Sequence, residues 1–265
     1  MPPLRFATFL APSMYPVYEY IAAYVGAHLG VPAHLHVGES FSEFAAGQAD
    51  AGFICGLPYV DLVAQTPAPV ALLTAPVIQG ARYGGQPIYY SDVIVHRDSP
   101  YRAFADLRGT RWAYNDVDSH SGYNITRYRL VQMGATDGFF GTVRAAGWHQ
   151  VAIGWVRGGQ IDAAAIDSHV LALALRDDPI LAADLRVIDT LGPATIQPVV
   201  AARQVPGPVQ AAIRAALLAL GDDPAARPML DQGLLARFVP VHDATYDDIR
   251  AMVRAATRVG FTSIR

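Results

Sequence analysis

Lysine is missing from this sequence, and all 20 basic residues are arginine. The absence excludes a lysine Schiff base for pyridoxal phosphate and the GK[ST] phosphate loop of nucleotide-hydrolysing proteins. An excess of either charge is missing too, because 20 arginines against 23 acidic residues give a net charge of −3. No basic stripe with interleaved aromatic residues occurs, so we expect no nucleic-acid partner.

Cysteine and long apolar runs are equally scarce. The single cysteine, Cys55, excludes an internal disulfide. No stretch of 18 uninterrupted apolar residues occurs, so the sequence predicts no membrane-spanning segment. The N-terminal stretch MPPLRFATFLAP lacks the basic segment, the apolar core and the small-residue cleavage site of an export signal. As written, the sequence therefore predicts a cytoplasmic protein.

What is present is a chain of 265 residues, 52% hydrophobic and 16% charged, a composition that excludes a disordered protein. Strand and helix patterns alternate from its start, with a strand at 4–10, a helix that ends at Gly30, a strand at 33–37, a short helix at 42–47 and a strand at 51–55. Such alternation is typical of a mostly parallel sheet flanked by helices.

A second alternating set predicts strands at 88–96, 110–114, 163–166 and 185–189, with helices at 148–157 and 168–176. The length suits two lobes of roughly 100 to 150 residues each. Because no linker or repeat interrupts the chain, we expect lobe 2 (91–194) to be inserted into lobe 1 (1–90 and 195–265), with two crossings between the lobes.

The stretch Ser119-His120-Ser121-Gly122 stands at the predicted start of a helix. One interpretation is capping, since a serine at this position accepts a hydrogen bond from an unpaired backbone N–H. The other is an anion site, in which both hydroxyls and the N–H groups of the first turn bind one oxyanion and Gly122 permits close approach. His120 either adds a donor that makes binding sensitive to pH near 6.5 or faces solvent, and the sequence leaves both open.

Several short motifs occur in a characteristic order: G-Q-A-D at 47–50, Y-Y-S-D at 89–92, D-L-R-G at 106–109, S-H-S-G-Y at 119–123 and G-G-Q-I-D at 158–162. In this order they resemble the PhnD-like phosphate, phosphite and phosphonate substrate-binding proteins of ABC transporters. The most specific part of the resemblance is D-L-R-G followed by S-x-S-G-Y.

The resemblance implies an α/β, two-lobed type 2 periplasmic-binding-protein fold with the ligand cleft between the lobes. It implies a solute-binding protein, without a cofactor and not an enzyme, that delivers a small phosphorus oxyanion or phosphonate to an ABC permease and its ATPase. It also implies a periplasmic or extracytoplasmic location, which the missing export signal does not support.

The resemblance further implies a set of ligand contacts beyond the S-x-S-G stretch. It places Tyr90 at the wall of the cleft and His149 as a donor to an anionic oxygen, with Tyr59 as a weaker candidate. Asp167 and His169 fall where the family recognises the part of the ligand that lacks phosphorus. Amine-binding members carry a carboxylate at the position aligned with His169, so the histidine argues against an aminoalkylphosphonate.

Other chemistries find less support in the sequence. His34 and His36 share one strand face, but no third metal ligand lies at a recognisable spacing. The hydrolase, metalloprotease and dinucleotide motifs G-x-S-x-G, H-E-x-x-H and G-x-G-x-x-G are absent. Two alternatives stay open: a cytosolic enzyme of the same fold, resembling the menaquinone-pathway enzymes that act on chorismate-derived carboxylates, and a soluble sensor lobe. The sequence names no general acid or base for the enzyme.

Overall fold

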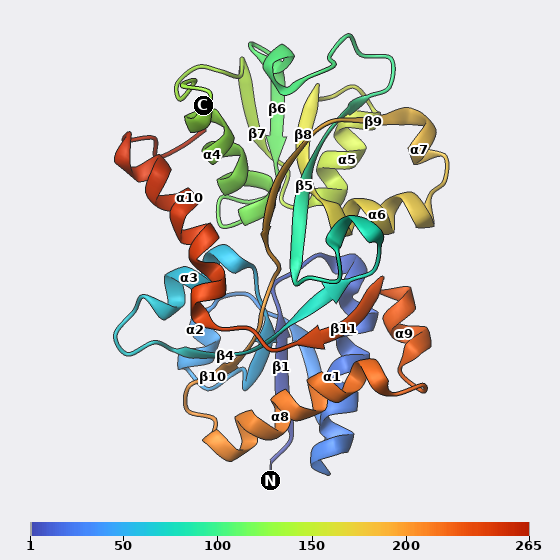
Figure 1. Cartoon of the computed structure of the whole chain (residues 1–265), viewed down its shortest axis with the longest axis vertical. Helices are drawn as coiled ribbons and strands as arrows, with labels where there is room; N and C mark the ends of the chain where they lie inside the picture. The colour runs from blue at the N-terminus through green and yellow to red at the C-terminus, as the bar shows by residue number, and fades with distance from the viewer. Residues whose placement is uncertain (1, 265) are drawn as a thin grey trace. The chain divides into compact units, whose positions relative to one another are not determined.

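The computed structural model describes residues 2–264 and divides into two compact units (Figure 1). Unit 1 comprises the chain up to Ile88 together with Thr195–Asp247, and unit 2 comprises Tyr89–Ala194 together with the chain from Asp248 onward. Each unit is built around one sheet with helices, so the predicted α/β class is confirmed. Among the described residues, no helix combines the length and apolarity needed to cross a bilayer.

Unit 1 holds a six-stranded sheet in the order β11-β4-β10-β3-β1-β2. Its strands are β1 (Leu4–Thr8), β2 (Ala33–Val37), β3 (Ala51–Phe53), β4 (Val70–Ile78), β10 (Val199–Ala202) and β11 (Leu235–Val239). Its helices are α1 (Tyr15–Leu29), α2 (Ser42–Ala45), α3 (Gly56–Val63), α8 (Gly207–Ala219) and α9 (Arg227–Gln232). Strand β1 pairs in parallel with β2 and β3, whereas β10 and β11 pair antiparallel with their neighbours.

Unit 2 holds a five-stranded sheet in the order β7-β6-β8-β5-β9. Its strands are β5 (Ile88–His96), β6 (Arg111–Tyr114), β7 (Thr142–Ala145), β8 (Ala163–Asp167) and β9 (Leu185–Thr195). Its α-helices are α4 (Ile125–Gln132), α5 (His149–Arg157), α6 (Ser168–Asp177), α7 (Leu181–Asp184) and α10 (Asp247–Arg258), of which α10 starts at the last residue of unit 1. Strand β6 runs parallel to β7 and β8, and β5 runs antiparallel to β8.

Both sheets are mixed: β1, β2, β3 and β4 share one direction in unit 1 and β6, β7 and β8 share one in unit 2, with antiparallel strands beside them. Two of the antiparallel strands, β5 and β10, are those with which the chain enters a unit anew after a crossing, whereas β11 follows α9 within unit 1. A strand that enters from the other unit is not preceded by a helix that returns it to the starting edge, so its direction does not follow from the local alternation. The sequence pattern shows where a strand lies but not which neighbour it meets.

The C-terminal segment belongs to unit 2, whereas we expected residues 195–265 to lie together in lobe 1. Helix α10 is buried along Ile249, Met252 and Ala256, a spacing of three and four residues. Beyond the helix, the N–H of Ile264 donates to the hydroxyl of Tyr123 at 3.1 Å. The chain thus crosses between the units three times rather than twice, because an amphipathic helix does not specify which of two cores it covers.

Candidate functional site

The S-x-S-G stretch forms a single turn of π-helix, η4 (His120–Asn124), that leads into α4. The N–H of Asn124 donates to the carbonyl of Ser119 at 3.1 Å, and the N–H of Ile125 donates to the carbonyl of His120. Such i to i−5 bonds widen the turn and are rare in proteins, where they concentrate at functional sites. We expected an ordinary α-helical first turn here, but the structure has a wider π-helical turn.

The Ser119 hydroxyl caps this turn by accepting the N–H of Gly122 at 3.1 Å. A hydroxyl that accepts one hydrogen bond still has a proton to donate, so Ser119 can cap the turn and also donate a hydrogen bond. Its oxygen lies 3.4 Å from that of Ser121, and Ser121 Oγ lies 3.0 Å from His149 Nε2. We call Ser119, Ser121, Gly122 and His149 the oxyanion cluster.

The pair of Ser121 and His149 holds one proton more than it uses internally. A neutral imidazole carries one N–H and the serine one O–H, and a single hydrogen bond joins the two groups. His149 is buried, and its Nδ1 has no hydrogen-bond partner among the described residues. Ser119, Ser121 and His149 together carry three such protons and are joined by two hydrogen bonds, so in either tautomer one donor of the three is not used among them.

Sheet topology explains why these residues meet. Strands β6, β7 and β8 are parallel, so their carboxyl ends share one edge of the sheet, where ligands of α/β proteins bind. Asn115 follows β6, His149 follows β7 after a short loop, and Asp167 ends β8. The antiparallel strand β5 brings Ser91 to the same edge, opposite Asp167.

Sequence reasoning missed two residues of this edge, Ser91 and Asn115. The buried Ser91 hydroxyl donates to the carbonyl of Ser121 at 2.5 Å and so fixes the π turn to β5. The side chain of Asn115 lies against Gly122, where a Cβ atom would overlap Asn115 Oδ1. Asn115 had a signal in the sequence, since it directly follows a predicted strand as the first polar residue; the contact of Ser91 is long-range and had none.

The other predicted site residues occupy different positions. Asp167 is the N-cap of α6, and its Oδ1 accepts the N–H of His169 at 2.8 Å; both side chains are buried. The N–H of Tyr90, a half-buried residue, donates to Ser168 Oγ at 3.1 Å. Tyr59 lies in unit 1, on α3, and its hydroxyl donates to Asp243 at 2.8 Å. This hydrogen bond of Tyr59 lies within its own unit.

His120 lies in the core, which rules out a solvent-facing role. Its side chain is fully buried, its Nδ1 lies 3.1 Å from Asn124 Nδ2, and its ring centroid lies 6.3 Å from that of Tyr89. Burial lowers the pKa of His120 to about 3 and that of His149 to about 3 as well. Both imidazoles are neutral at physiological pH, so the expected sensitivity of binding near pH 6.5 through His120 is wrong.

The two buried histidines predict an acid-labile unit 2. Their folded-state pKa values lie below the unfolded value of about 6.5, so between these values the unfolded chain takes up protons that the folded chain does not. The free energy of unfolding should therefore fall as pH drops below 6.5, by up to about 1.4 kcal/mol per pH unit for each histidine. Urea unfolding followed by circular dichroism at pH 7 and pH 4.5 measures the effect.

A His149→Gln variant separates the histidine contribution from that of the carboxylates, which also titrate in acid. The amide keeps polar atoms near Ser121 but binds no proton in this range. We expect the loss of stability between pH 7 and pH 4.5 to be smaller in the variant than in the wild type. An equal loss in both proteins would show that His149 does not stay neutral in the folded chain.

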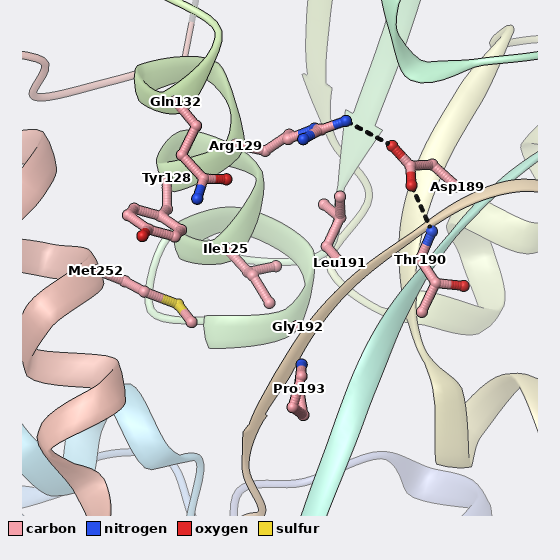
Figure 2. Close-up of a pocket in the computed structure, with 10 residues that line it drawn as sticks. All are labelled: Ile125, Tyr128, Arg129, Gln132, Asp189, Thr190, Leu191, Gly192, Pro193 and Met252. Atoms are coloured by element: carbon pink, nitrogen blue, oxygen red, sulfur yellow. Dashed lines mark hydrogen bonds and ion pairs between the residues drawn. The ribbon is translucent and has the colours of Figure 1, made fainter. Parts of the chain in front are cut away.

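A cavity of ≈ 170 Å³ lies elsewhere in unit 2, between α4, β9 and α10 (Figure 2). Figure 2 shows Arg129 Nη2 directed at Asp189, at 3.2 Å, with Ile125 and Leu191 on the wall below and Met252 facing them. The cavity contains none of the predicted ligand residues. Its guanidinium is paired with a carboxylate, which makes it a weaker anion site than an uncompensated arginine would be.

His34 and His36 on β2 do not form part of a metal site among the described residues. His36 Nε2 lies 2.7 Å from Glu43, whose other oxygen accepts the N–H groups of Glu39 and Ser40. Within residues 2–264, no group of three or more histidine, cysteine or acidic side chains is arranged to hold a metal ion. The contact of His36 with Glu43 instead ties the loop after β2 to α2.

Residues 6–246 match the family described as the ABC transporter, phosphonate, periplasmic substrate-binding protein, and the chain belongs to this family. The family resemblance expected from the ordered motifs is therefore confirmed. No curated protein sequence matches the chain.

Solved structures agree in fold. PhnD1 from Prochlorococcus marinus, in complex with methylphosphonate, superposes with a TM-score of 0.84 at 17% identity and covers 97% of this chain and 98% of its own. A binding protein component of an ABC phosphonate transporter from Pseudomonas aeruginosa gives 0.85 at 16%, over 98% and 88%. The aliphatic sulphonate binding protein SsuA from Escherichia coli gives 0.65 at 16%, also over 98% and 88%. At these identities the likeness shows the fold alone.

Proposed function

We propose that this chain binds a small phosphorus oxyanion or phosphonate through the oxyanion cluster and serves as the substrate-binding component of an ABC transporter. The observation that carries the proposal is the arrangement at η4: two serine hydroxyls, the N–H groups at the start of a π turn and a buried neutral imidazole adjoin one another. Hydroxyl and imidazole groups can donate hydrogen bonds to tetrahedral oxygens, and so can N–H groups of such a turn other than that of Gly122, which donates to Ser119. Family membership supports the same assignment.

The absence of lysine fits this mode of recognition. A helix start and hydroxyl groups stabilise negative charge by dipoles and hydrogen bonds, so an ion pair is not required. The guanidinium of Arg127 on α4 donates to Asn124 and to the carbonyl of Thr262, and Arg129 faces Asp189. These arginines stabilise the elements around the cluster rather than supply its donors.

Isothermal titration with methylphosphonate, phosphite, phosphate and aminoethylphosphonate tests the proposal. We expect saturable binding of at least one of the first three, and weaker binding of aminoethylphosphonate because the buried His169 offers no carboxylate for the amine. If none of the four ligands binds or raises the thermal stability of the protein, the assignment of the cluster is wrong.

Ser121→Ala should weaken binding of the best ligand by roughly 1 to 3 kcal/mol, or about 5- to 150-fold, the scale of a lost hydrogen bond to a charged group. The substitution removes both the hydroxyl and its bond to His149. Arg129→Gln is the matched control in the same unit, and its affinity should stay within a factor of about two. Unchanged affinity in Ser121→Ala would leave Ser121 with a structural role only.

We further propose that the chain acts without chemical turnover, delivers its ligand to a membrane permease and works outside the cytoplasm, as its family membership suggests. Phosphorus NMR of the protein incubated with its tightest ligand should show the resonances of free and bound ligand and nothing else. A new resonance that grows with time would instead indicate an enzyme.

A further inference from the structure

Asn115 presents a buried acceptor to a site otherwise made of donors. Its Oδ1 is buried and has no hydrogen-bond partner among the described residues. The point where a Cβ on Gly122 would lie overlaps Asn115 Oδ1 and is 3.2 Å from His149 Cε1. The amide oxygen and the imidazole therefore flank the same face of Gly122, beside the oxyanion cluster.

The packing against Gly122 also explains why the oxygen of the amide, rather than its nitrogen, lies there. The Cα of Gly122 presents C–H groups to this position, and a carbonyl oxygen forms a weak C–H···O contact with them. If the amide nitrogen of Asn115 lay there instead, its hydrogens would face the Cα hydrogens of Gly122. The contact therefore holds Oδ1 in place as an acceptor.

A buried acceptor without a donor is destabilising, so it favours a ligand that supplies the donor. A fully ionised tetrahedral oxyanion has only acceptor oxygens, and so has a sulfonate. The monoanion of a phosphonate or of phosphite keeps one P–OH group. This group matches the donor that Asn115 Oδ1 lacks, while its ionised oxygens match the hydroxyls and N–H groups of the cluster.

We propose that Asn115 is a specificity-determining residue that accepts the P–OH proton of a monoanionic phosphonate or phosphite and thereby disfavours sulfonates and the dianions of phosphonate and phosphite. The inference rests on the proposed function of the oxyanion cluster. The fold does not make this choice, because it is shared with proteins described as binding phosphonate and with one described as binding sulphonates.

Titratable groups on the surrounding elements are Asp116 and Asp118 in the loop of Asn115, Tyr114 on β6, His120 and Tyr123 on η4, His149 on α5, and Asp167 and His169 at the junction of β8 and α6. The lowered pKa keeps His120 and His149 neutral above pH 5. Burial and the charge of Asp116 raise the pKa of Asp118 from that of an ordinary aspartate. A loss of methylphosphonate affinity above pH 6 that methanesulfonate does not share is therefore assigned to the ligand. Its phosphoryl group loses its second proton near neutrality, with a pKa of about 6 in phosphomonoesters.

Titration of the wild-type protein with methylphosphonate and methanesulfonate between pH 6 and pH 8.5 tests the proposal without any substitution. We expect methanesulfonate to bind at least tenfold more weakly than methylphosphonate at pH 6. We also expect methylphosphonate affinity to fall by up to tenfold per pH unit once the ligand has lost its second proton. Equal affinities for the two ligands, or a flat pH profile for methylphosphonate, would overturn the proposal.

Asn115→Leu removes the acceptor at similar volume, and Gln132→Leu makes the same kind of change at an exposed amide on α4. We expect Asn115→Leu to bind methylphosphonate at least tenfold more weakly and methanesulfonate no more weakly, whereas Gln132→Leu keeps the wild-type ratio. A proportional loss for both ligands in Asn115→Leu would contradict the specificity role. Binding of phosphonates without discrimination overturns this inference alone, whereas failure of the wild type to bind methylphosphonate and phosphite overturns the proposed function as well.

Discussion

Gly122→Ala is expected to reduce the affinity for methylphosphonate by at least tenfold. The added Cβ would overlap Asn115 Oδ1 and lie 3.2 Å from His149 Cε1, so the amide must move away and the imidazole is pressed from its position. Both groups adjoin the proposed oxyanion site, where displacements of an ångström would strongly weaken hydrogen bonds to a ligand. Titration of the variant with methylphosphonate, under the conditions used for the wild type, measures the loss.

Gly154→Ala is the matched control. Gly154 lies within α5 of the same unit, and a Cβ there would meet no atom within 4 Å. The substitution should leave affinity unchanged and stabilise the helix by roughly 0.5 to 1 kcal/mol, since alanine loses less conformational entropy than glycine. Wild-type affinity in Gly122→Ala would show that the face of Gly122 is not part of the binding site.

Trp112→Ala should lower the free energy of unfolding by about 3 to 5 kcal/mol. Trp112 on β6 is fully buried and stacks on Phe140 with ring centroids 4.5 Å apart, and it meets Phe104 edge-on at 5.9 Å. Its removal leaves a cavity among aromatic rings that cannot close without moving the strand. Urea unfolding followed by circular dichroism measures the change.

Trp148→Ala provides the comparison, because Trp148 is 41% exposed and precedes α5. Its replacement should change stability by no more than about 0.5 kcal/mol. A loss of similar size in the two variants would mean that the aromatic cluster around Trp112 is not the core of unit 2. A small loss in Trp112→Ala would mean that the cluster repacks.

The local elements followed from the sequence with good accuracy where the pattern was strong. The predicted strands at 33–37 and 88–96 are observed with the same bounds, and the helix that ends at Gly30 is terminated by that glycine in a left-handed conformation. In contrast, β7 (Thr142–Ala145) was not predicted. It is an edge strand of four residues with three of them exposed, so it lacks the hydrophobic alternation by which strands are predicted.

The residues of the candidate site also differ in how far the sequence predicted them. Ser119, Ser121 and Gly122 are close together in the chain. A helix start that carries hydroxyl groups predicts unpaired backbone N–H groups beside them, whatever the rest of the fold. His149 entered through the resemblance of the ordered motifs, and the structure places its Nε2 beside Ser121. Asn115 carried only the weak signal of its place after a strand, because its distance to Gly122 depends on the path of the loop between β6 and η4, which no sequence pattern specifies.

By itself, the sequence determined the α/β class, the family and the helix start at 119–122, because these depend on neighbours along the chain and on the order of motifs. The tertiary structure decided the strand directions, the unit to which α10 belongs, the widening of the first turn into a π-helix and the burial of His120. It also placed Asn115 beside Gly122. Most of these follow from contacts between residues distant in sequence, whose free energies are settled only when the chain has packed.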